Sequence, residues 1–579
     1  MVARISLITA FATLVVGELQ RSCRILPTDP SWPNSEVWEA FNQSIDGRLI
    51  KTVPIGSPCH DPTYDEAECN LIRENWHIPD FHEPNPSSLM DPTFLNKSCD
   101  PFDPRETPCR IGAYVQYAVN VSSPEHVIKT VKFVKEHNIR FVVKNTGHDY
   151  LGRSTATGAV SVWLHNLQNI TFLPQYTSSG YSGPAFKVHT GVTVYDLEME
   201  AHSRGLAIVG GECPTVAFAG GYLQGGGHSA LTSFYGLAAD QTLEFEVITT
   251  QGKFVRASPT SNEDLYWALS GGGGGYGVVW SATVKAQQDL PATVASLNFT
   301  IEGIDQETFW KAIDAYQAST PTLTDTKIFS IAVYTKQTFS LNPVFAVDKS
   351  ASEVSTLLQP LTNTLDDLGV EYEIAVNTYD GYLDAYNTIT FLREFKVGDN
   401  IFGSRLLPRL IWEDKDKLKE LQDTITQILE DGAIVQDFSL RATGPGNSDN
   451  AVLPAWRDAE RHFAVILPTI DGDSLEDVAR DRNRITNKFM PALKQLTPGS
   501  GSYVNEGDPY EPDFKEAFYG SNYDRLLEIK DKWDPRQVLY GSLSVGGDRW
   551  KQTEEGRLCR TEDVHAVPYL VDPTSYHNF

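Results

Sequence analysis

The sequence predicts an α+β protein with a glycine-rich first module and a second module richer in helices. In the first module, short apolar strands alternate with single helices, and paired glycines recur between residues 210 and 277. After about residue 290 these glycine runs stop, and amphipathic helices alternate with apolar strands. A chain of 579 residues has room for both modules and for further segments.

The first module is expected to begin with a strand, a helix and a second strand. Residues 112–121 form the first strand, and Ser123-Pro124-Glu125 opens a helix whose apolar residues recur on one face. The second strand covers 140–144 and leads into a polar turn. Further strands are expected at 159–164, 185–190, 241–249, 253–256 and 281–286.

The second module is expected to contain helices at 306–316, 351–362 and 414–429 and a strand at 328–334. Near residue 500 the density of glycine, tyrosine and proline rises again, which indicates that the chain returns to the first module. The predicted division is a signal peptide at 1–18, a cysteine-containing extension at 19–106, the first module at 107–289, the second module at 290–500 and the return at 501–579.

The composition excludes some partners. The chain has 48 basic and 75 acidic side chains, a formal net charge of -27, and the acidic residues are scattered. Such a charge repels phosphate backbones and anionic lipid surfaces, so neither a nucleic acid nor a membrane is an expected partner. The acidity itself is typical of a soluble surface.

The first residues are typical of a secretory signal peptide. Arg4 precedes an apolar run over 5–16 that ends in small residues. The alternative, a membrane anchor, is disfavoured because the run is shorter than the roughly 20 apolar residues that a spanning helix needs. N-glycosylation motifs agree with export, and the chain is expected to carry glycans at some of these positions: Asn42, Asn96, Asn120, Asn169 and Asn298.

The cysteines divide into six and one. Cys23, Cys59, Cys69, Cys99, Cys109 and Cys559 lie outside the central region, and in an oxidising compartment three disulfides would use them all. Their pairing stays open, because six cysteines allow 15 connectivities. Cys213 remains without a partner.

The glycine-rich segments indicate a phosphate cradle. They are Gly210-Gly211, Gly220-Gly221 with 225–227, and 271–275 with Gly277. A flexible linker is the alternative, but these glycines alternate with large apolar residues between predicted strands. Glycine lets backbone amides converge on a diphosphate. None of the segments has the strand, helix and acidic residue of a nicotinamide dinucleotide fingerprint.

Three motifs, in this order, resemble the berberine-bridge-enzyme-like branch of the vanillyl-alcohol oxidase superfamily. Residues 144–154, Lys-Asn-Thr-Gly-His-Asp-Tyr-Leu-Gly-Arg-Ser, are similar to its flavin-attachment loop. Residues 211–216, Gly-Glu-Cys-Pro-Thr-Val, running on to Gly225-Gly226-Gly227-His228, resemble its second attachment segment. Residues 522–526, Asn-Tyr-Asp-Arg-Leu, ending at Asp534-Pro535, resemble its C-terminal motif.

The resemblance implies a two-domain fold, with an FAD-binding domain and a substrate domain in which helices flank an antiparallel sheet. It also implies that His148 bonds to the flavin 8α-methyl carbon and Cys213 to ring carbon 6, since imidazole and thiolate are nucleophiles. A structural histidine and an inert buried cysteine are the alternatives. The other cofactor-binding residues implied are Asn145, Thr146, Gly147, Asp149, Tyr150, Ser154, Gly211, Pro214, Val216, Gly220, Gly221, Gly225, Gly226, His228, Gly277, Val278, Val279, Asn522 and Tyr523.

The catalytic base is expected among Tyr503 and Glu506. Where carbohydrate and alcohol oxidases of the family have Tyr-x-Asn-Tyr, this chain has Tyr503-Val504-Asn505-Glu506, so the resemblance transfers the role of the second tyrosine to a carboxylate. The alternative is a solvated glutamate in a loop. Val216 stands where relatives have an oxygen gate that valine leaves open, although an ordinary core valine fits as well.

No metal site is expected, because cysteine and histidine pairs of ligand spacing are missing from the sequence; His148, Cys213 and His228 are the weaker metal alternative.

Taken together, the motifs predict a secreted FAD-dependent oxidase. It takes hydride from an alcohol, a carbohydrate or an aromatic natural product and passes the electrons to O2, giving H2O2. The alternatives are an oxidase that closes a ring in secondary metabolism and a flavin-carrying binding protein with little turnover. Residues 450–457 either line the substrate cavity or form a structural turn.

Overall fold

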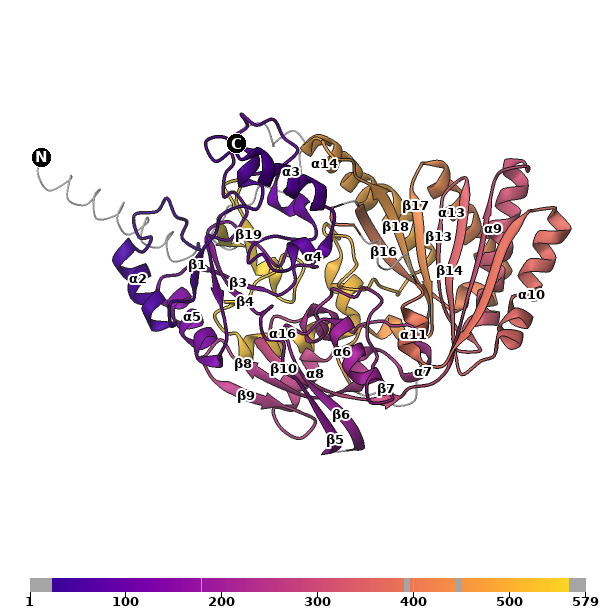
Figure 1. The fold of residues 1–579 in the computed structure, drawn as a ribbon, viewed down its shortest axis with the longest axis horizontal. Coiled ribbons are helices and arrows are strands. Elements are labelled where there is room, and N and C mark those ends of the chain that lie inside the picture. Colours follow the sequence, from indigo (N-terminus) through magenta and orange to yellow (C-terminus); the bar gives the residue numbers. More distant parts are fainter. Residues whose placement is uncertain (1–22, 179, 390–395, 399, 444–448, 562–579) are drawn as a thin grey trace, which may run out of the picture.

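The structure, a computed structural model, describes residues 23–178, 180–389, 396–398, 400–443 and 449–561. The predicted signal peptide lies outside the described residues. The structure has the mixed α+β composition that the sequence predicts (Figure 1).

A small, mostly parallel sheet begins the first module. Its strand order is β1-β2-β4-β3, and β4 runs parallel to both β2 and β3. Pro124 occupies the first turn of α5, where its missing N–H costs nothing, and Val127, Val131 and Val134 bury the apolar face of that helix. The bounds are β1 Leu49–Lys51, β2 Tyr117–Asn120, α5 Pro124–Glu136, β3 Arg140–Lys144 and β4 Ala159–Trp163. The loop with His148 follows β3 directly.

An antiparallel sheet completes the first module, in the order β5-β6-β10-β8-β9. The strand expected at 281–286 starts earlier, because Val278 and Val279 are buried and pair with β8. The bounds are β5 Ile170–Ser178, β6 Tyr181–His189, α6 Val194–His202, β7 Leu206–Ala207, α7 Thr232–Tyr235, β8 Thr242–Ile248, β9 Phe254–Ala257, α8 Glu263–Leu269, β10 Val278–Lys285 and β11 Gln287–Gln288.

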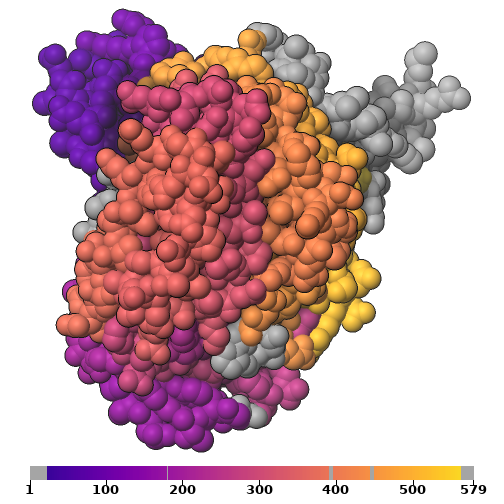
Figure 2. Space-filling view, turned by 90° about the vertical axis from the view of Figure 1, so that its right-hand side faces the viewer, coloured from indigo at the N-terminus to yellow at the C-terminus, as the bar shows by residue number. Residues whose placement is uncertain are grey.

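A large antiparallel sheet forms the second module, in the order β15-β12-β14-β13-β17-β18-β16. Successive residues of its strands face opposite sides: Ile331 packs toward the first module, and Ala332 packs beneath α9, α10 and α13. Figure 2 looks onto the outer, helical side of this module, with the indigo N-terminal residues at its upper edge.

The bounds of the second module are β12 Ala292–Thr300, α9 Gln306–Thr324, β13 Phe329–Tyr334, β14 Thr338–Val347, α10 Ala351–Leu368, β15 Tyr372–Tyr379, α11 Tyr382–Tyr386, β16 Asn400–Pro408, α12 Leu410–Glu413, α13 Lys415–Glu430, β17 Ile434–Ser439, β18 Ala459–Pro468, α14 Leu475–Arg484 and α15 Met490–Leu496.

The C-terminal segment, yellow in Figure 1, lies between the two modules. Leu406 of β16 donates its N–H to the carbonyl of Gly501, 2.8 Å away. The Lys530 ammonium of α16 donates to the carbonyls of Gly275 and Leu539, at 2.7 and 2.8 Å. This segment therefore joins the glycine-rich part of the first module to the second module. The bounds are α16 Tyr523–Trp533, β19 Trp550–Gln552 and β20 Leu558–Arg560.

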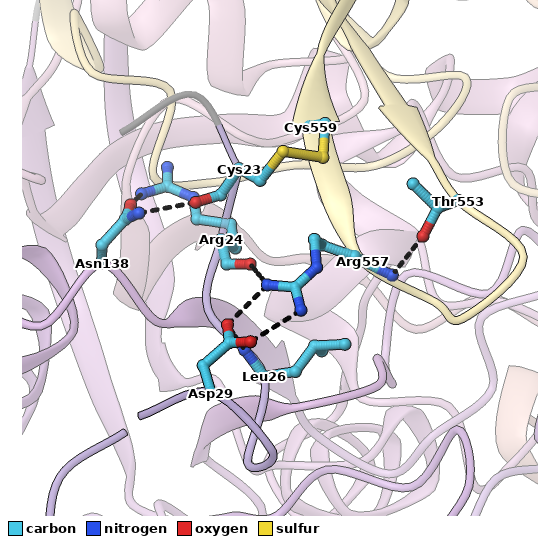
Figure 3. Close-up of a disulfide and its surroundings, with 8 residues drawn as sticks. All are labelled: Cys23, Arg24, Leu26, Asp29, Asn138, Thr553, Arg557 and Cys559. Atoms are coloured by element: carbon cyan, nitrogen blue, oxygen red, sulfur yellow. Dashed lines mark hydrogen bonds and ion pairs between the residues drawn. A yellow bond between two sulfur atoms is a disulfide. The ribbon is translucent and has the colours of Figure 1, made fainter. Parts of the chain in front are cut away.

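Disulfides hold the N-terminal extension. Within the described residues the pairs are Cys23–Cys559, Cys59–Cys69 and Cys99–Cys109, and Cys213 forms no disulfide there. Figure 3 shows the first pair joining the two ends of the described chain, beside the Arg557–Asp29 ion pair. The prediction that these six cysteines pair and leave Cys213 is confirmed. The extension contains α2 Ser35–Ser44, α3 Glu66–Asn75 and α4 Pro79–His82.

Among the described residues, no helix is long and apolar enough to cross a membrane.

Candidate functional site

A cavity of about 310 Å³ lies in the first module where the C-terminal segment covers it. The loop after β3, the Cys213 segment, the glycine run at 273–275 and the loop at 503–506 line it. All three resemblance motifs lie in or near this region, but the third, at 522–526, contributes no residue to the lining. The cavity is the candidate cofactor site.

His148 and Cys213 meet at one hydroxyl group. His148 Nε2 lies 2.7 Å from Thr215 Oγ1, and Cys213 Sγ lies 3.6 Å from the same oxygen. Both side chains line the cavity, although their positions are 65 apart in the sequence. Thr215 therefore contacts both the imidazole and the thiol, which two separate sequence motifs had indicated.

Burial keeps both groups uncharged. Burial, with the nearby Lys144 ammonium, lowers the pKa of His148 to about 3. Burial raises the pKa of the Cys213 thiol to about 11, against the opposing hydrogen bond of Thr215. At pH 7 His148 is therefore a neutral imidazole with a lone pair, and Cys213 is a thiol.

The cavity has the features that a bound dinucleotide requires. Gly273, Gly274 and Gly275 have φ of +82°, +76° and +91°, a run that only glycine adopts without strain. Asn145 Oδ1 and Thr190 Oγ1 are buried and have no hydrogen-bond partner among the described residues. Buried polar atoms of this kind normally bind something, so the residues present fit a polar cofactor.

Glu506 is held between two histidines at the edge of the cavity. His228 Nε2 lies 3.1 Å from Glu506 Oε1, and His462 Nε2 lies 2.6 Å from Glu506 Oε2. The other ring nitrogen of His228, Nδ1, pairs with the Glu212 carboxylate at 3.2 Å. The Glu506 side chain is 28% exposed, whereas His228 and His462 are 4% and 0% exposed, so the carboxylate faces the cavity and the imidazoles stand behind it.

The charges of this cluster follow from their neighbours. Burial alone would raise the pKa of Glu506, but the two imidazoles hold it well below its ordinary value. Burial would lower the pKa of His228, but Glu212 and Glu506 hold it well above its ordinary value. Burial lowers the pKa of His462, against its bond to Glu506. At pH 7 the cluster is an ionised Glu506 between a protonated His228 and a neutral His462.

His228, His462 and Glu506 also have the side chains of a metal site, with ligand atoms within 4.8 Å of one another. The 2.6 Å between His462 and Glu506 is a hydrogen-bond distance. Two ligands of one tetrahedral ion would stand roughly 3.3 Å apart. Hydrogen bonds therefore account for the cluster as it stands.

The predicted site residues separate into two groups. Those that line the cavity are Asn145, Thr146, Gly147, His148, Asp149, Tyr150, Ser154, Cys213, Val216, Gly220, Gly221, Gly277, Val278, Val279, Tyr503 and Glu506. Those that do not are Gly211, Pro214, Gly225, Gly226, His228, Asn522 and Tyr523. Asn522, for example, donates to the carbonyls of Ala451 and Val452, at 3.2 and 3.1 Å, and so holds the segment 450–457 instead.

Several residues of the site were not predicted from the sequence. Arg153 pairs with Asp149 and donates to Asn505 Oδ1 at 3.3 Å, which ties the attachment loop to the Glu506 loop. Lys530 and Tyr540 line the cavity from the C-terminal segment. His462 comes from β18, and no local pattern in that strand distinguishes it. Of these residues, only Arg153 stands in a recognisable motif, at the end of residues 144–154.

Family models match the chain at two places. A model described as "FAD binding domain" matches residues 115–258, and one described as "Berberine and berberine like" matches residues 502–546. With the fold and the cavity, these matches define an FAD-binding flavoprotein.

Curated relatives match nearly the whole chain. The FAD-linked oxidoreductase patO of Aspergillus clavatus is 42% identical over 93% of this chain and 95% of its own. The bifunctional decalin synthase calF of Penicillium decumbens is 37% identical over 93% and 96%. The chain therefore belongs to the berberine-bridge-enzyme-like branch of the VAO-type FAD-linked oxidoreductases.

Solved structures agree. The VAO-type flavoprotein MtVAO615 from Myceliophthora thermophila has a TM-score of 0.89 at 35% identity, over 93% of this chain and all of its own. Glucooligosaccharide oxidase from Acremonium strictum, described as carrying a 6-S-cysteinyl, 8α-N1-histidyl FAD, has a TM-score of 0.59 at 18% identity, over 74% and 91%. The latter likeness concerns the fold alone.

Proposed function

We propose that this FAD-linked oxidoreductase is a secreted oxidase whose FAD is bonded to both His148 and Cys213. The observation that carries the proposal is the meeting of these two side chains at Thr215, on the wall of one cavity. A neutral imidazole, which is a nucleophile as it stands, and a thiol, which becomes one when it loses its proton, lie on that wall. The relative described with a cysteinyl and histidyl FAD supports the same arrangement.

The proposed reaction is removal of hydride from an alcohol carbon of a carbohydrate, an alcohol or an aromatic natural product. When bound, FAD supplies the hydride acceptor. Glu506 accepts the proton of the substrate hydroxyl, because it is an ionised carboxylate that lines the cavity and, unlike Asp149, does not pair with an arginine. His228 and His462 fix the carboxylate by one hydrogen bond to each oxygen, so that it cannot turn away from the substrate.

Dioxygen is the proposed final acceptor, with H2O2 as the product. Val216, the residue at the position of the oxygen gate, lines the cavity. Export is supported by the disulfides and by the exposed side chains of Asn96 and Asn169 in their glycosylation motifs.

An oxidase that closes a ring in secondary metabolism is the second candidate. The relative named as a bifunctional decalin synthase favours it. Both candidates share the hydride and proton transfers, and they differ in whether the oxidised substrate then forms an intramolecular bond.

The expected result that tests the proposal is bleaching of the flavin without oxygen. Purified protein is mixed anaerobically in a stopped-flow instrument with oligosaccharides, alcohols and hydroxylated aromatic natural products, and the flavin absorbance is followed. We expect at least one class to bleach the flavin and added O2 to restore the colour with an equimolar amount of H2O2. Product analysis by mass and NMR then separates a simple carbonyl from a new ring. If no class bleaches the flavin, the protein is a binding protein rather than an oxidase.

A further inference from the structure

The attachment loop is enclosed by a segment that lies outside both matched family regions. Residues 76–99 of the N-terminal extension, here called the brace segment, contact this loop and precede the first matched residue, 115. Figure 1 labels the short helix of this segment, α4, which is indigo.

Backbone contacts fix the residue next to His148. Met90 donates its N–H to the carbonyl of Gly147, 3.0 Å away. Gly147 has a φ of +98°, and a Cβ there would stand 3.0 Å from the carbonyl oxygen of Ser88. The brace segment and the loop are therefore packed backbone against backbone at the residue that precedes His148.

Lys144, the last residue of β3, makes a second contact with the brace segment. This fully buried side chain donates to the carbonyl of Asn85 at 2.9 Å and to that of Asn145 at 3.2 Å. The Asn85 side chain shapes its own turn by accepting the N–H groups of Ser87 and Ser88, at 3.0 and 2.9 Å. A buried ammonium thus links the brace segment to the start of the attachment loop.

The same ammonium acts on His148 through its charge. Burial, with the Lys144 ammonium second, lowers the pKa of His148, which keeps the imidazole neutral. Burial lowers the pKa of Lys144 itself to about 7, and Glu83 of the brace segment opposes that shift. The brace segment therefore contributes both the acceptor that Lys144 binds and a carboxyl group near it.

The far side of the brace segment is anchored twice. The Cys99–Cys109 disulfide packs with Leu89, Leu95 and Tyr114 in one apolar cluster. On the other side Met90 accepts a hydrogen bond from the N–H of Gly398, 3.1 Å away in the second module. The segment is therefore held between the attachment loop and the rest of the protein.

We propose that the brace segment and Lys144 position His148 for its bond to the flavin. Lys144 is a positioning residue: it holds the start of the loop to the backbone carbonyl of Asn85. Cys213 is on a different loop and does not need this contact. The inference rests on the proposed bicovalent attachment.

The test uses Lys144→Met, which keeps the length of the side chain and removes its charge and both hydrogen bonds. Purified protein is denatured and digested, and the flavin-bearing peptides around His148 and Cys213 are quantified by mass. We expect the variant to lose flavin from the His148 peptide and to keep it on the Cys213 peptide. Lys135→Met, which removes a bond from a lysine of α5 to the carbonyl of Thr250, is the matched control and should keep both linkages.

A second pair of variants tests the brace segment without touching the loop. Cys99→Ser/Cys109→Ser removes the disulfide beside Leu89 and Leu95, and Cys59→Ser/Cys69→Ser removes one outside that cluster. We expect only the first to lower the flavin on His148.

The internal comparison separates the possible failures. A misfolded variant loses flavin from both peptides, so the flavin on the Cys213 peptide reports whether the variant has folded. If Lys144→Met misfolds, the two disulfide variants decide whether the brace segment positions His148. If Lys144→Met and Cys99→Ser/Cys109→Ser both keep the His148 linkage at the level of the unchanged protein, the brace proposal is wrong while the proposed function stands. If the unchanged protein carries no flavin on His148, the proposed attachment itself fails.

Discussion

Glu506→Gln is expected to slow anaerobic flavin reduction by about 10²- to 10⁴-fold, the usual contribution of a positioned general base. Glutamine keeps the size of the side chain, but its amide cannot take the hydroxyl proton of a substrate. The variant should therefore keep its flavin and its fold. The limiting reduction rate at saturating substrate, measured by stopped-flow absorbance, is the quantity that changes.

Glu511→Gln is the matched control for this variant. Glu511 is also a buried glutamate, but it pairs with Lys494 and does not line the cavity. We expect its reduction rate to stay within a factor of about two of the unchanged protein. Equal rates for Glu506→Gln and the unchanged protein would remove Glu506 from the reaction and leave Tyr503 as the remaining predicted base.

The pH dependence of the same rate follows from the directions of the pKa shifts. Because the pKa of Glu506 is lowered, the carboxylate stays ionised as the pH falls below the ordinary glutamate value of about 4.3. The ion pair between Glu506 and His228 therefore stabilises the fold above that value, and this stabilisation is lost only as the pH falls through the lowered pKa of Glu506. His228, with a raised pKa, contributes fully below its ordinary value of about 6.5 and loses the contribution as the pH rises through the raised pKa.

It follows that the unchanged protein should show no acid loss of the reduction rate between about pH 7 and 5. In His228→Asn the main cation beside Glu506 is gone, so its pKa rises and an acid loss should enter that range. A profile that is identical in the two proteins would contradict the assigned charge of His228.

Asp437→Asn is expected to destabilise the second module by about 3–5 kcal/mol, as breaking a buried ion pair does. Asp437 and Arg461 are both 0% exposed and lie 3.2 Å apart. The hydroxyls of Tyr316 and Tyr334 donate to the same carboxylate, at 2.6 and 2.8 Å. The neutral amide leaves the Arg461 charge without its partner and replaces one acceptor oxygen by a donor.

Unfolding in urea, followed by tryptophan fluorescence, measures this loss. Asp325→Asn is the matched control, because Asp325 pairs with Arg409 while 48% exposed, and an exposed pair contributes about 1 kcal/mol or less. If the two variants unfold at the same urea concentration, the buried cluster does not hold the module together.

The elements with strong local patterns could be predicted from the sequence. The strand at 140–144 coincides with β3, and the helix expected from Ser123-Pro124-Glu125 is α5, because proline and the apolar period mark its start and face. In contrast, β5 was missed: it contains Pro174 and leaves most of its residues exposed or half-buried, so it has no apolar alternation.

The candidate site was predictable only in part, for a similar reason. His148, Cys213 and Glu506 stand in motifs that are continuous in sequence, so the residues themselves indicate their roles. His462 contacts Glu506 from a distant segment, and Asn85 accepts a hydrogen bond from Lys144 through its backbone carbonyl. A contact between segments far apart in the chain leaves no local pattern, and a backbone acceptor leaves no residue type to recognise.

Precipitation of the purified protein in acid, followed by peptide mapping of the pellet, tests the bicovalent attachment most directly. We expect the yellow colour to stay with the chain and flavin to be found on the peptides of both His148 and Cys213. His148→Ala and Cys213→Ala should each keep flavin through the remaining bond, with altered absorbance, and the double variant should release it. Release of the flavin from the unchanged protein into the acid supernatant would show that neither residue is bonded to it.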